Sequence, residues 1–276
     1  MSVHNPPAAL LFDVFGTVVD WRSSISTALI QRSAKTLQST ADISQNARER
    51  ATAMKESDWH TFAQEWRSSY GAFTKDFDPS RDTFISVDEH HYTSLKSLLT
   101  KYGLDGLWTS TEIKELSLAW HFLNPWADSV RGLEKLSEKF TTTTLSNGNE
   151  SLLEDLRRHG PLKFDRIFSG EQFRAYKPNP LVYNGAAEKL GLSTGQCALV
   201  AAHLGDLKAA KGCGYQTVYV ERPQEESYSD EEVLRAKEEG WVDMWVNGRG
   251  EGFLDVARRF GINISEKLGE ASCGSE

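Results

Sequence analysis

The sequence contains few cysteines and no pattern that would pair them. Cys197, Cys213 and Cys273 form neither a close pair nor a metal-ligand spacing. An odd number of cysteines without such a pattern is typical of a reducing compartment, which predicts a cytoplasmic protein. A disulfide framework or a structural zinc site is therefore not what organises this chain.

Long apolar runs and blocks of positive charge are also absent. No stretch approaches the ~18 continuous apolar residues of a membrane span, and the first residues lack the basic segment of a signal peptide. The formal net charge is −8, without a lysine- or arginine-rich block. We therefore expect no binding to nucleic acid or to a membrane, although a local cluster of cations can still receive a small anion.

The composition is that of a globular protein with a sizeable core. Apolar residues make up 39% of the 276 positions and charged residues 25%. This length accommodates one large domain or two smaller ones. Residues 21–124 are rich in aromatic side chains, and their apolar positions recur at helical spacing without a convincing strand.

From residue 125 onward, strand patterns alternate with helical patterns. Together with an apolar run at 10–12, the predicted strands are 140–146, 166–170, 197–202, 216–221 and 243–248. The predicted helices are 150–160, 179–191, 206–214, 229–240 and 252–261. Strands that alternate with helices of about 10–12 residues indicate a parallel sheet covered on both faces.

These patterns predict an α/β fold with a doubly wound, Rossmann-like parallel sheet. The first strand is separated from the others by the helical block, so we expect a catalytic core formed by residues 1–20 and 125–265. A helical cap, residues 21–124, is inserted into it, and residues 124–130 form the returning hinge. Residues 266–276 read as a C-terminal tail.

Ligands of doubly wound sheets bind beyond the carboxyl ends of the strands. Four predicted strands are followed by polar side chains: Asp13 and Thr17, Ser146 and Asn147, Lys177, and His203 and Asp206. Because these strand ends meet at one edge of a parallel sheet, we expect the side chains to lie together. A carboxylate such as Asp13 at the end of a buried strand costs free energy to bury unless it is solvated or paired, or unless the charge has a function.

Lys177 is suited to pair with that carboxylate. A nearby ammonium lowers the pKa of a carboxyl group and keeps it ionised. Lys177 also precedes Pro178-Asn179-Pro180 at a helix start, a positive region that suits an anionic substrate.

Four segments resemble, in order, the four motifs of the haloacid dehalogenase superfamily. They are FDVFGT (12–17), TLSNGN (144–149), YKPNPLVY (176–183) and LVAAHLGD (199–206). Within this superfamily, the four motifs are most similar to those of the type II, hydrolytic 2-haloacid dehalogenases. The resemblance implies that Asp13 is the nucleophile and forms an ester with a small 2-haloalkanoic acid. Hydrolysis of this ester would release the 2-hydroxy acid. The resemblance implies no cofactor.

The resemblance also implies roles for other residues. Arg67, which follows Trp66, would assist the leaving halide, and Tyr183 would help line the site. Ser146 and Asn147 would donate hydrogen bonds to the substrate carboxylate, while Asp206 would fix Lys177 or the attacking water. A homodimer is the oligomeric state that the family suggests.

Two departures from the phosphate-processing relatives favour a dehalogenase. Those relatives carry a second Asp two positions after the nucleophile, where this chain has Phe15, and a halide leaves without needing a proton. They also bind Mg²⁺ through a pair of acids in the fourth motif, where this chain has Ala201-Ala202 and the single acid Asp206. We therefore predict no metal site.

Other departures concern the dehalogenases themselves. The usual Tyr is replaced by Phe15, and His203 stands where Ser and Asn are common, so His203 is a candidate to orient the hydrolytic water or act as its base. Structural interpretations remain open for Phe15, Tyr183, Ser146, Asn147, Asp206, His203 and Arg67. The alternative functions are an Mg²⁺-dependent phosphatase of the same superfamily and a non-catalytic binding protein on this fold.

Overall fold

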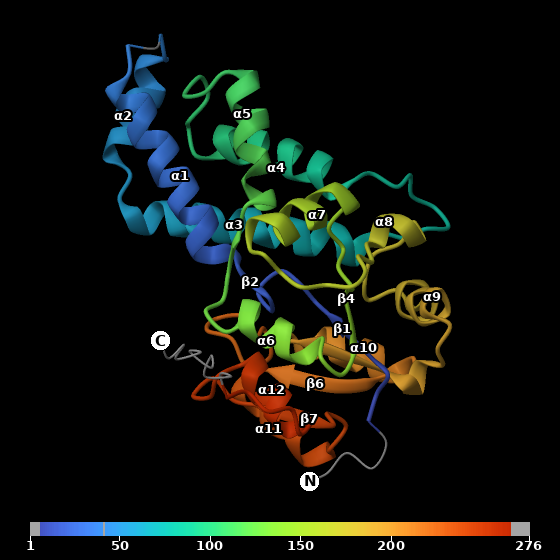
Figure 1. The fold of residues 1–276 in the computed structure, drawn as a ribbon. Helices are drawn as coiled ribbons and strands as arrows, with labels where there is room; N and C mark the ends of the chain where they lie inside the picture. Colours follow the sequence, from blue (N-terminus) through green and yellow to red (C-terminus); the bar gives the residue numbers. More distant parts are fainter. Residues whose placement is uncertain (1–5, 41, 266–276) are drawn as a thin grey trace, which may run out of the picture.

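The computed structural model describes residues 6–40 and 42–265, and it contains a five-stranded sheet between two layers of helices (Figure 1). The strands are Ala9–Phe12 (β1), Thr141–Thr144 (β4), Cys197–Ala201 (β5), Gln216–Val220 (β6) and Met244–Val246 (β7). Their order is β4-β1-β5-β6-β7, and every neighbouring pair is parallel. The predicted doubly wound α/β fold is confirmed.

Strand β1 lies inside the sheet, between β4 and β5. Leu11 pairs with Thr143 on one side and with Leu199 on the other, and all four residues of β1 are buried. A strand covered on both faces and both edges reads as a continuous apolar run, which explains the sequence ALLF. Asp13 then stands at the carboxyl end of a central strand.

Alternate residues of β1 face two separate hydrophobic layers. Leu10 and Phe12 join one cluster, whereas Ala9 and Leu11 join the other. The first cluster includes side chains of Ser129–Leu136 (α6), Glu150–His159 (α7) and Phe253–Arg259 (α12). The second includes side chains of Pro180–Leu190 (α9), Leu204–Gly212 (α10) and Asp230–Glu239 (α11).

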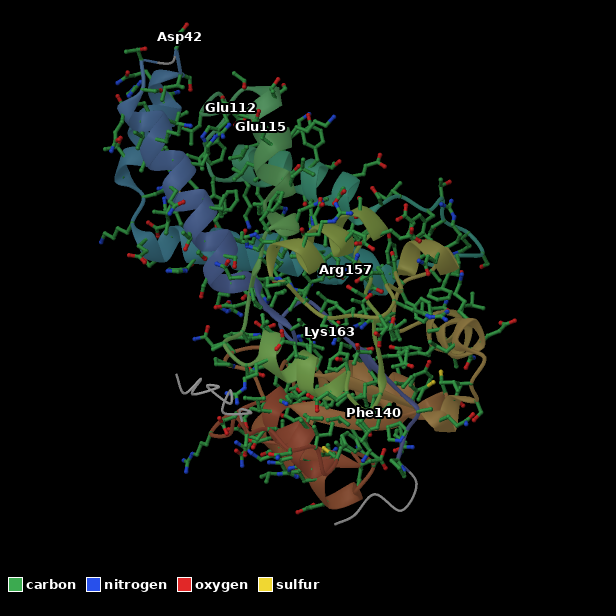
Figure 2. The ribbon with its side chains drawn as sticks, viewed as in Figure 1. Asp42, Glu112, Glu115, Phe140, Arg157 and Lys163 are labelled. Atoms are coloured by element: carbon green, nitrogen blue, oxygen red, sulfur yellow. The ribbon has the colours of Figure 1, made fainter. Side chains whose placement is uncertain are left out.

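Residues 21–121 are mostly helical and lie over one end of the sheet (Figure 1). Its helices are Trp21–Gln38 (α1), Gln45–Ala53 (α2), Glu56–Asp76 (α3), Val87–Lys101 (α4) and Ser110–Ser117 (α5), followed by the 3₁₀ turn Leu118–His121 (η1). We call α1 to η1 the helical segment. Glu112 and Glu115 of α5 lie 3.4 and 3.1 Å from the Arg32 guanidinium of α1, and Figure 2 labels both acids.

The two ends of the helical segment lie side by side. Val19–Asp20 (β2) pairs antiparallel with Asn124–Pro125 (β3), and the Trp126 backbone N–H donates to the Val18 carbonyl at 3.1 Å. The sequence analysis missed this short pairing, which falls on the predicted hinge. The boundaries of core and cap stay a prediction that this arrangement supports.

The strand predicted at 166–170 is wrong. This segment forms only isolated bridges, Thr143 with Arg166 and Ser146 with Ser169. The Thr144 hydroxyl accepts from the Phe168 N–H at 3.0 Å, so a side chain takes the place of a regular ladder bond there. A short helix, Gly170–Phe173 (α8), follows directly.

Two earlier expectations concern other parts of the chain. The predicted tail, 266–276, and Cys273 lie outside the described residues. Among residues 6–40 and 42–265, no helix is both long enough and apolar enough to cross a membrane.

Candidate active site

A cleft of about 760 Å³ opens between the carboxyl edge of the sheet and helix α3. Asp13, Phe15, Asn147, Lys177, His203 and Asp206 line it from the sheet side, and Arg67 and Tyr70 line it from α3. The cleft therefore combines residues from three strand ends with residues of the helical segment. Thr17, Ser146 and Tyr183, which were expected to bind substrate, do not line it.

Asp13 is paired with three side chains at the base of the cleft. Its Oδ1 lies 2.9 Å from Nζ of Lys177, and its Oδ2 lies 2.7 Å from the Thr17 hydroxyl and 3.0 Å from Nδ1 of His203. Burial alone would raise the pKa of Asp13, but Lys177 and His203 together hold it well below its usual range. Asp13 is therefore a carboxylate at neutral pH although it is only 8% exposed.

Lys177 lies between two acids. Its Nζ is 2.5 Å from Oδ2 of Asp206 as well as 2.9 Å from Asp13, and the ammonium is buried. Burial opposes its charge, but the two carboxylates raise the pKa of Lys177 above its ordinary value. Asp206 is oriented in turn by Tyr183, whose hydroxyl donates to its Oδ1 at 2.6 Å. Tyr183 is fully buried and contacts Asp206 rather than the cleft.

Asn147 contacts the backbone of Lys177. Its Oδ1 accepts from the Lys177 N–H at 2.6 Å, and its Nδ2 donates to the Lys177 carbonyl at 3.2 Å. Ser146 is fully buried, and its Oγ accepts from the Gly148 N–H at 3.2 Å. Direct binding of substrate by these two residues stays a prediction, while the observed contacts are those of a loop that positions Lys177.

His203 is held between two carboxylates. Its Nδ1 faces Asp13, and its Nε2 lies 3.4 Å from Oε2 of Glu225. Burial lowers the pKa of His203, but the hydrogen bonds to Asp13 and Glu225 outweigh it and raise the pKa to about 9. His203 is therefore protonated at neutral pH while Asp13 is ionised.

Arg67 supplies a cation from the helical segment. Its guanidinium carbon lies 4.6 Å from the centre of the Tyr70 ring, 5.7 Å from that of Phe15 and 5.8 Å from that of Trp21. No ion pair between Arg67 and an acidic side chain occurs within the described residues. A guanidinium that is surrounded by aromatic rings and faces a cleft can receive an anion.

Sequence analysis missed Glu225, which lies in the loop after β6. Its side chain is buried, accepts from Trp21 Nε1 at 3.0 Å and reaches His203. The signal was present, because this loop also follows a strand at the same edge of the sheet. Gly16 makes room for it: a Cβ there would lie 2.0 Å from Oε2 of Glu225, and the residue has φ +81°.

The cleft does not match the ligand set that Mg²⁺ needs. Within the described residues, no group of three or more His, Cys, Asp or Glu side chains is arranged to hold a metal. A divalent cation that bridged Asp13 and Asp206 would have to displace the Lys177 ammonium, which is paired with both. Independence from metal stays a prediction.

Residues 7–214 match the sequence profile of the family described as haloacid dehalogenase-like hydrolases. The chain belongs to this family. The profile covers most of the chain and includes all four motifs, so the family predicted from them is confirmed.

This hydrolase is similar to proteins named 2-haloacid dehalogenases. A solved structure of a defluorinating L-2-haloacid dehalogenase is 31% identical, with a TM-score of 0.75, over 92% of this chain and 95% of that one. (S)-2-haloacid dehalogenase 4A of Burkholderia cepacia is 26% identical over 78% of this chain and 83% of its own length. (S)-2-haloacid dehalogenase 1 of Pseudomonas sp. strain CBS-3 is 34% identical over 45% of this chain, and the match spans 58% of that protein.

Proposed function

We propose that this hydrolase removes the halide from a small 2-haloalkanoic acid and releases the 2-hydroxy acid. The observation that carries the proposal is the ionised, buried Asp13 at the base of a cleft whose opposite wall presents the Arg67 guanidinium. A carboxylate nucleophile needs to be ionised and aligned. A departing halide is stabilised by a cation that stays protonated, as a guanidinium does. The names of the similar proteins support the same chemistry.

In the first step, Asp13 attacks C2 of the haloacid. A bond forms between the Asp13 carboxylate and C2 while the carbon–halide bond breaks, and the halide leaves with its electron pair toward Arg67. Phe15, buried against Tyr70 and Trp120, gives this part of the cleft an apolar wall. No proton is required, which agrees with the lack of an acid at position 15.

In the second step, water hydrolyses the aspartyl ester. The water attacks the side-chain carbonyl carbon of Asp13, and Asp206, fixed by Tyr183 and Lys177, takes its proton. That proton then goes to the oxygen of the departing hydroxy acid. The second proton of the water, left on the oxygen added to Asp13, passes to solvent, which restores the Asp13 carboxylate. Because C2 undergoes a single displacement, its configuration is inverted.

The helical segment completes the cleft, so we also propose that it acts as the predicted cap. Helix α3 brings Arg67 and Tyr70 to the sheet edge, and α1 begins with Trp21, which also lines the cleft. A cytoplasmic location and a homodimer accompany this proposal as expectations; sedimentation of the purified protein tests the second.

Halide release from a panel of 2-haloacids, with and without EDTA, tests the function. The panel includes both enantiomers of 2-chloropropionate, chloroacetate and fluoroacetate, alongside p-nitrophenyl phosphate with Mg²⁺. We expect EDTA-resistant halide release from at least one haloacid and no comparable phosphate release. Phosphate release that EDTA abolishes and Mg²⁺ restores would favour the phosphatase, and binding without turnover would favour a non-catalytic protein.

A further inference from the structure

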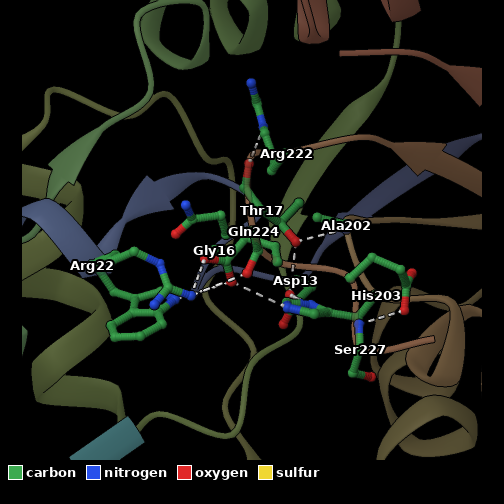
Figure 3. Close-up of polar contacts among 12 residues, drawn as sticks. Asp13, Gly16, Thr17, Arg22, Ala202, His203, Arg222, Gln224 and Ser227 are labelled. Carbon is green, nitrogen blue, oxygen red and sulfur yellow. Dashed lines mark hydrogen bonds and ion pairs between the residues drawn. The ribbon is translucent and has the colours of Figure 1, made fainter. Parts of the chain in front are cut away.

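The two carboxylate oxygens of Asp13 have different surroundings. Oδ1 contacts one donor among the described residues, Nζ of Lys177 at 2.9 Å. Oδ2 contacts two donors, the Thr17 hydroxyl at 2.7 Å and Nδ1 of His203 at 3.0 Å, as Figure 3 shows. Oδ1 thus keeps a lone pair for attack, whereas Oδ2 is already engaged.

The direction of both hydrogen bonds to Oδ2 is fixed by the neighbouring groups. The Thr17 oxygen accepts from the Ala202 N–H at 2.9 Å, so its own proton is directed to Asp13. Both nitrogens of His203 face carboxylate oxygens, which accept and cannot donate when ionised. Both nitrogens therefore carry protons, and His203 donates to Oδ2 as an imidazolium.

We propose that Oδ2 of Asp13 carries the negative charge that develops during ester hydrolysis, that Thr17 and His203 stabilise it as an oxyanion hole, and that Glu225 is a positioning residue that keeps His203 protonated. This inference rests on the proposed function and adds a role to its second step. It assigns His203 to the stabilisation of charge instead of to the activation of water.

The same geometry shows how the electrons move during ester hydrolysis. Oδ1 forms the ester bond to C2, which leaves Oδ2 as the carbonyl oxygen. When water adds to the carbonyl carbon, the π electrons move to Oδ2, and the two donors are already within hydrogen-bond distance. The electrons return as the bond from the carbonyl carbon to the alkyl oxygen breaks, and the hydroxy acid leaves.

Glu225 supplies the charge that persists when Asp13 is esterified. In the free enzyme, Asp13 and Glu225 favour protonated His203, whereas burial and the Arg67 cation oppose it. Ester formation removes the charge of Asp13 but not that of Glu225, which is held by Trp21 Nε1 at 3.0 Å and faces the Arg22 guanidinium at 4.0 Å. The raised pKa of His203, about 9 before substrate reacts, agrees with this arrangement.

Single-turnover kinetics separate this role from that of a general base. With enzyme in excess, halide release reports ester formation, and quenched hydroxy acid reports ester hydrolysis. We expect His203→Ala to retain the halide burst and to slow ester hydrolysis about 10²–10³-fold, the usual loss for an oxyanion donor. His203→Gln, which keeps an N–H donor but offers no base, should recover much of that loss.

The pH profile gives the opposite sign for the two roles. An imidazolium donor loses activity as the pH rises and it deprotonates, whereas a general base loses activity as the pH falls. We expect the rate of ester hydrolysis in the wild type to fall at alkaline pH, and Glu225→Gln to move this fall to lower pH. Since Glu225→Gln retains both the shape and an oxygen acceptor, its pH shift remains readable even if His203→Ala fails to fold.

A matched control is His60→Ala, which removes a histidine of α3 that does not line the cleft. It should leave both half-reactions unchanged. Ester hydrolysis that is unaffected in His203→Ala, that shows no fall at alkaline pH, or that keeps its pH profile in Glu225→Gln would overturn the oxyanion hole while halide release still stands. A wild type that releases no halide from any haloacid would refute the proposed function, and this inference with it.

Discussion

The side-chain amide of Asn147 hydrogen-bonds both polar groups of the Lys177 backbone. Its Oδ1 accepts from the Lys177 N–H at 2.6 Å, and its Nδ2 donates to the Lys177 carbonyl at 3.2 Å. Both residues are buried, so water cannot replace these bonds easily. The end of β4 thereby fixes the backbone that carries the ammonium facing Asp13.

Replacement of this amide should affect both stability and catalysis. Asn147→Ala leaves a buried N–H and carbonyl without partners, so we expect the free energy of unfolding to fall by about 1–3 kcal/mol. Ester formation should also slow, because Lys177 is less well placed to keep Asp13 ionised and aligned. Urea unfolding and the halide burst measure the two effects.

The control for this change is Asn247→Ala, at an exposed position after β7. Its unfolding free energy should stay within about 0.5 kcal/mol of that of the wild type. If Asn147→Ala retains full stability and an unchanged halide burst, the contacts of Asn147 are not what positions Lys177.

Removal of the Arg67 cation should mainly affect the carbon–halide step. Arg67→Ala is expected to lower kcat/KM by about 10²–10³-fold, a typical loss when a group that stabilises developing charge is removed. Arg67→Lys keeps the charge but not the planar group over Tyr70, so it should recover only part of the loss. Arg81→Ala, on a well-exposed side chain, serves as the control. A loss below threefold in Arg67→Ala would argue against a role in halide departure.

The rule that ligands bind beyond the carboxyl ends of strands predicted Asp13, His203 and Asp206 correctly as neighbours, whereas Lys177 joins them although the strand it was expected to follow does not form. It works because the parallel register of β1 with β4 and β5 brings these ends to one edge. The rule does not say which way a side chain turns. Tyr183 reaches Asp206 instead of the cleft, and this depends on how α9 packs on α10.

Glu225 shows why the rest of the site was harder to predict. Several acids occur in the loop after β6, and none differs from the others by local pattern. The one that turns inward is selected by partners distant in sequence: the Trp21 N–H, the His203 ring and the space left by Gly16. Such a selection exists only once the fold has formed.

The contacts of His121 join the helical segment to helix α7, and they predict a contribution to stability that depends on pH. Its Nε2 lies 3.0 Å from Oδ1 of Asp88 on α4, and its Nδ1 lies 2.8 Å from Oδ2 of Asp155 on α7. Burial lowers the pKa of His121, but the bonds to both carboxylates outweigh it and raise the pKa. Because the folded-state pKa is raised, the stabilisation is fully present below the unfolded value of about 6.5. It is lost as the pH rises through the folded value.

Comparison of the wild type with His121→Gln isolates this contribution. The difference in unfolding free energy should be largest near about pH 6 and should shrink at alkaline pH. Chemical denaturation at several pH values measures it, with His60→Gln as the control for loss of an imidazole elsewhere. A difference that does not change with pH would show that His121 contributes packing alone.

Isotope labelling tests whether Asp13 forms the ester. In the proposed mechanism, water attacks the carbonyl carbon of Asp13 and never C2. A single turnover in H₂¹⁸O with enzyme in excess should therefore place the heavy oxygen in the Asp13 side chain and leave the first hydroxy acid unlabelled. Mass spectrometry of the peptide that contains FDVFGT locates the label, and Asp13→Asn, a near-isosteric but poor nucleophile, should give neither turnover nor label.

Stereochemistry cannot replace this experiment, because direct attack of water on C2 also inverts the carbon. Direct attack would instead put the label in the product and none in the peptide. His203 would not be the base for such an attack, because it is held protonated between Asp13 and Glu225. Label in the product alone, with turnover confirmed, would reduce Asp13 to an electrostatic role and would remove the ester on which the oxyanion hole depends.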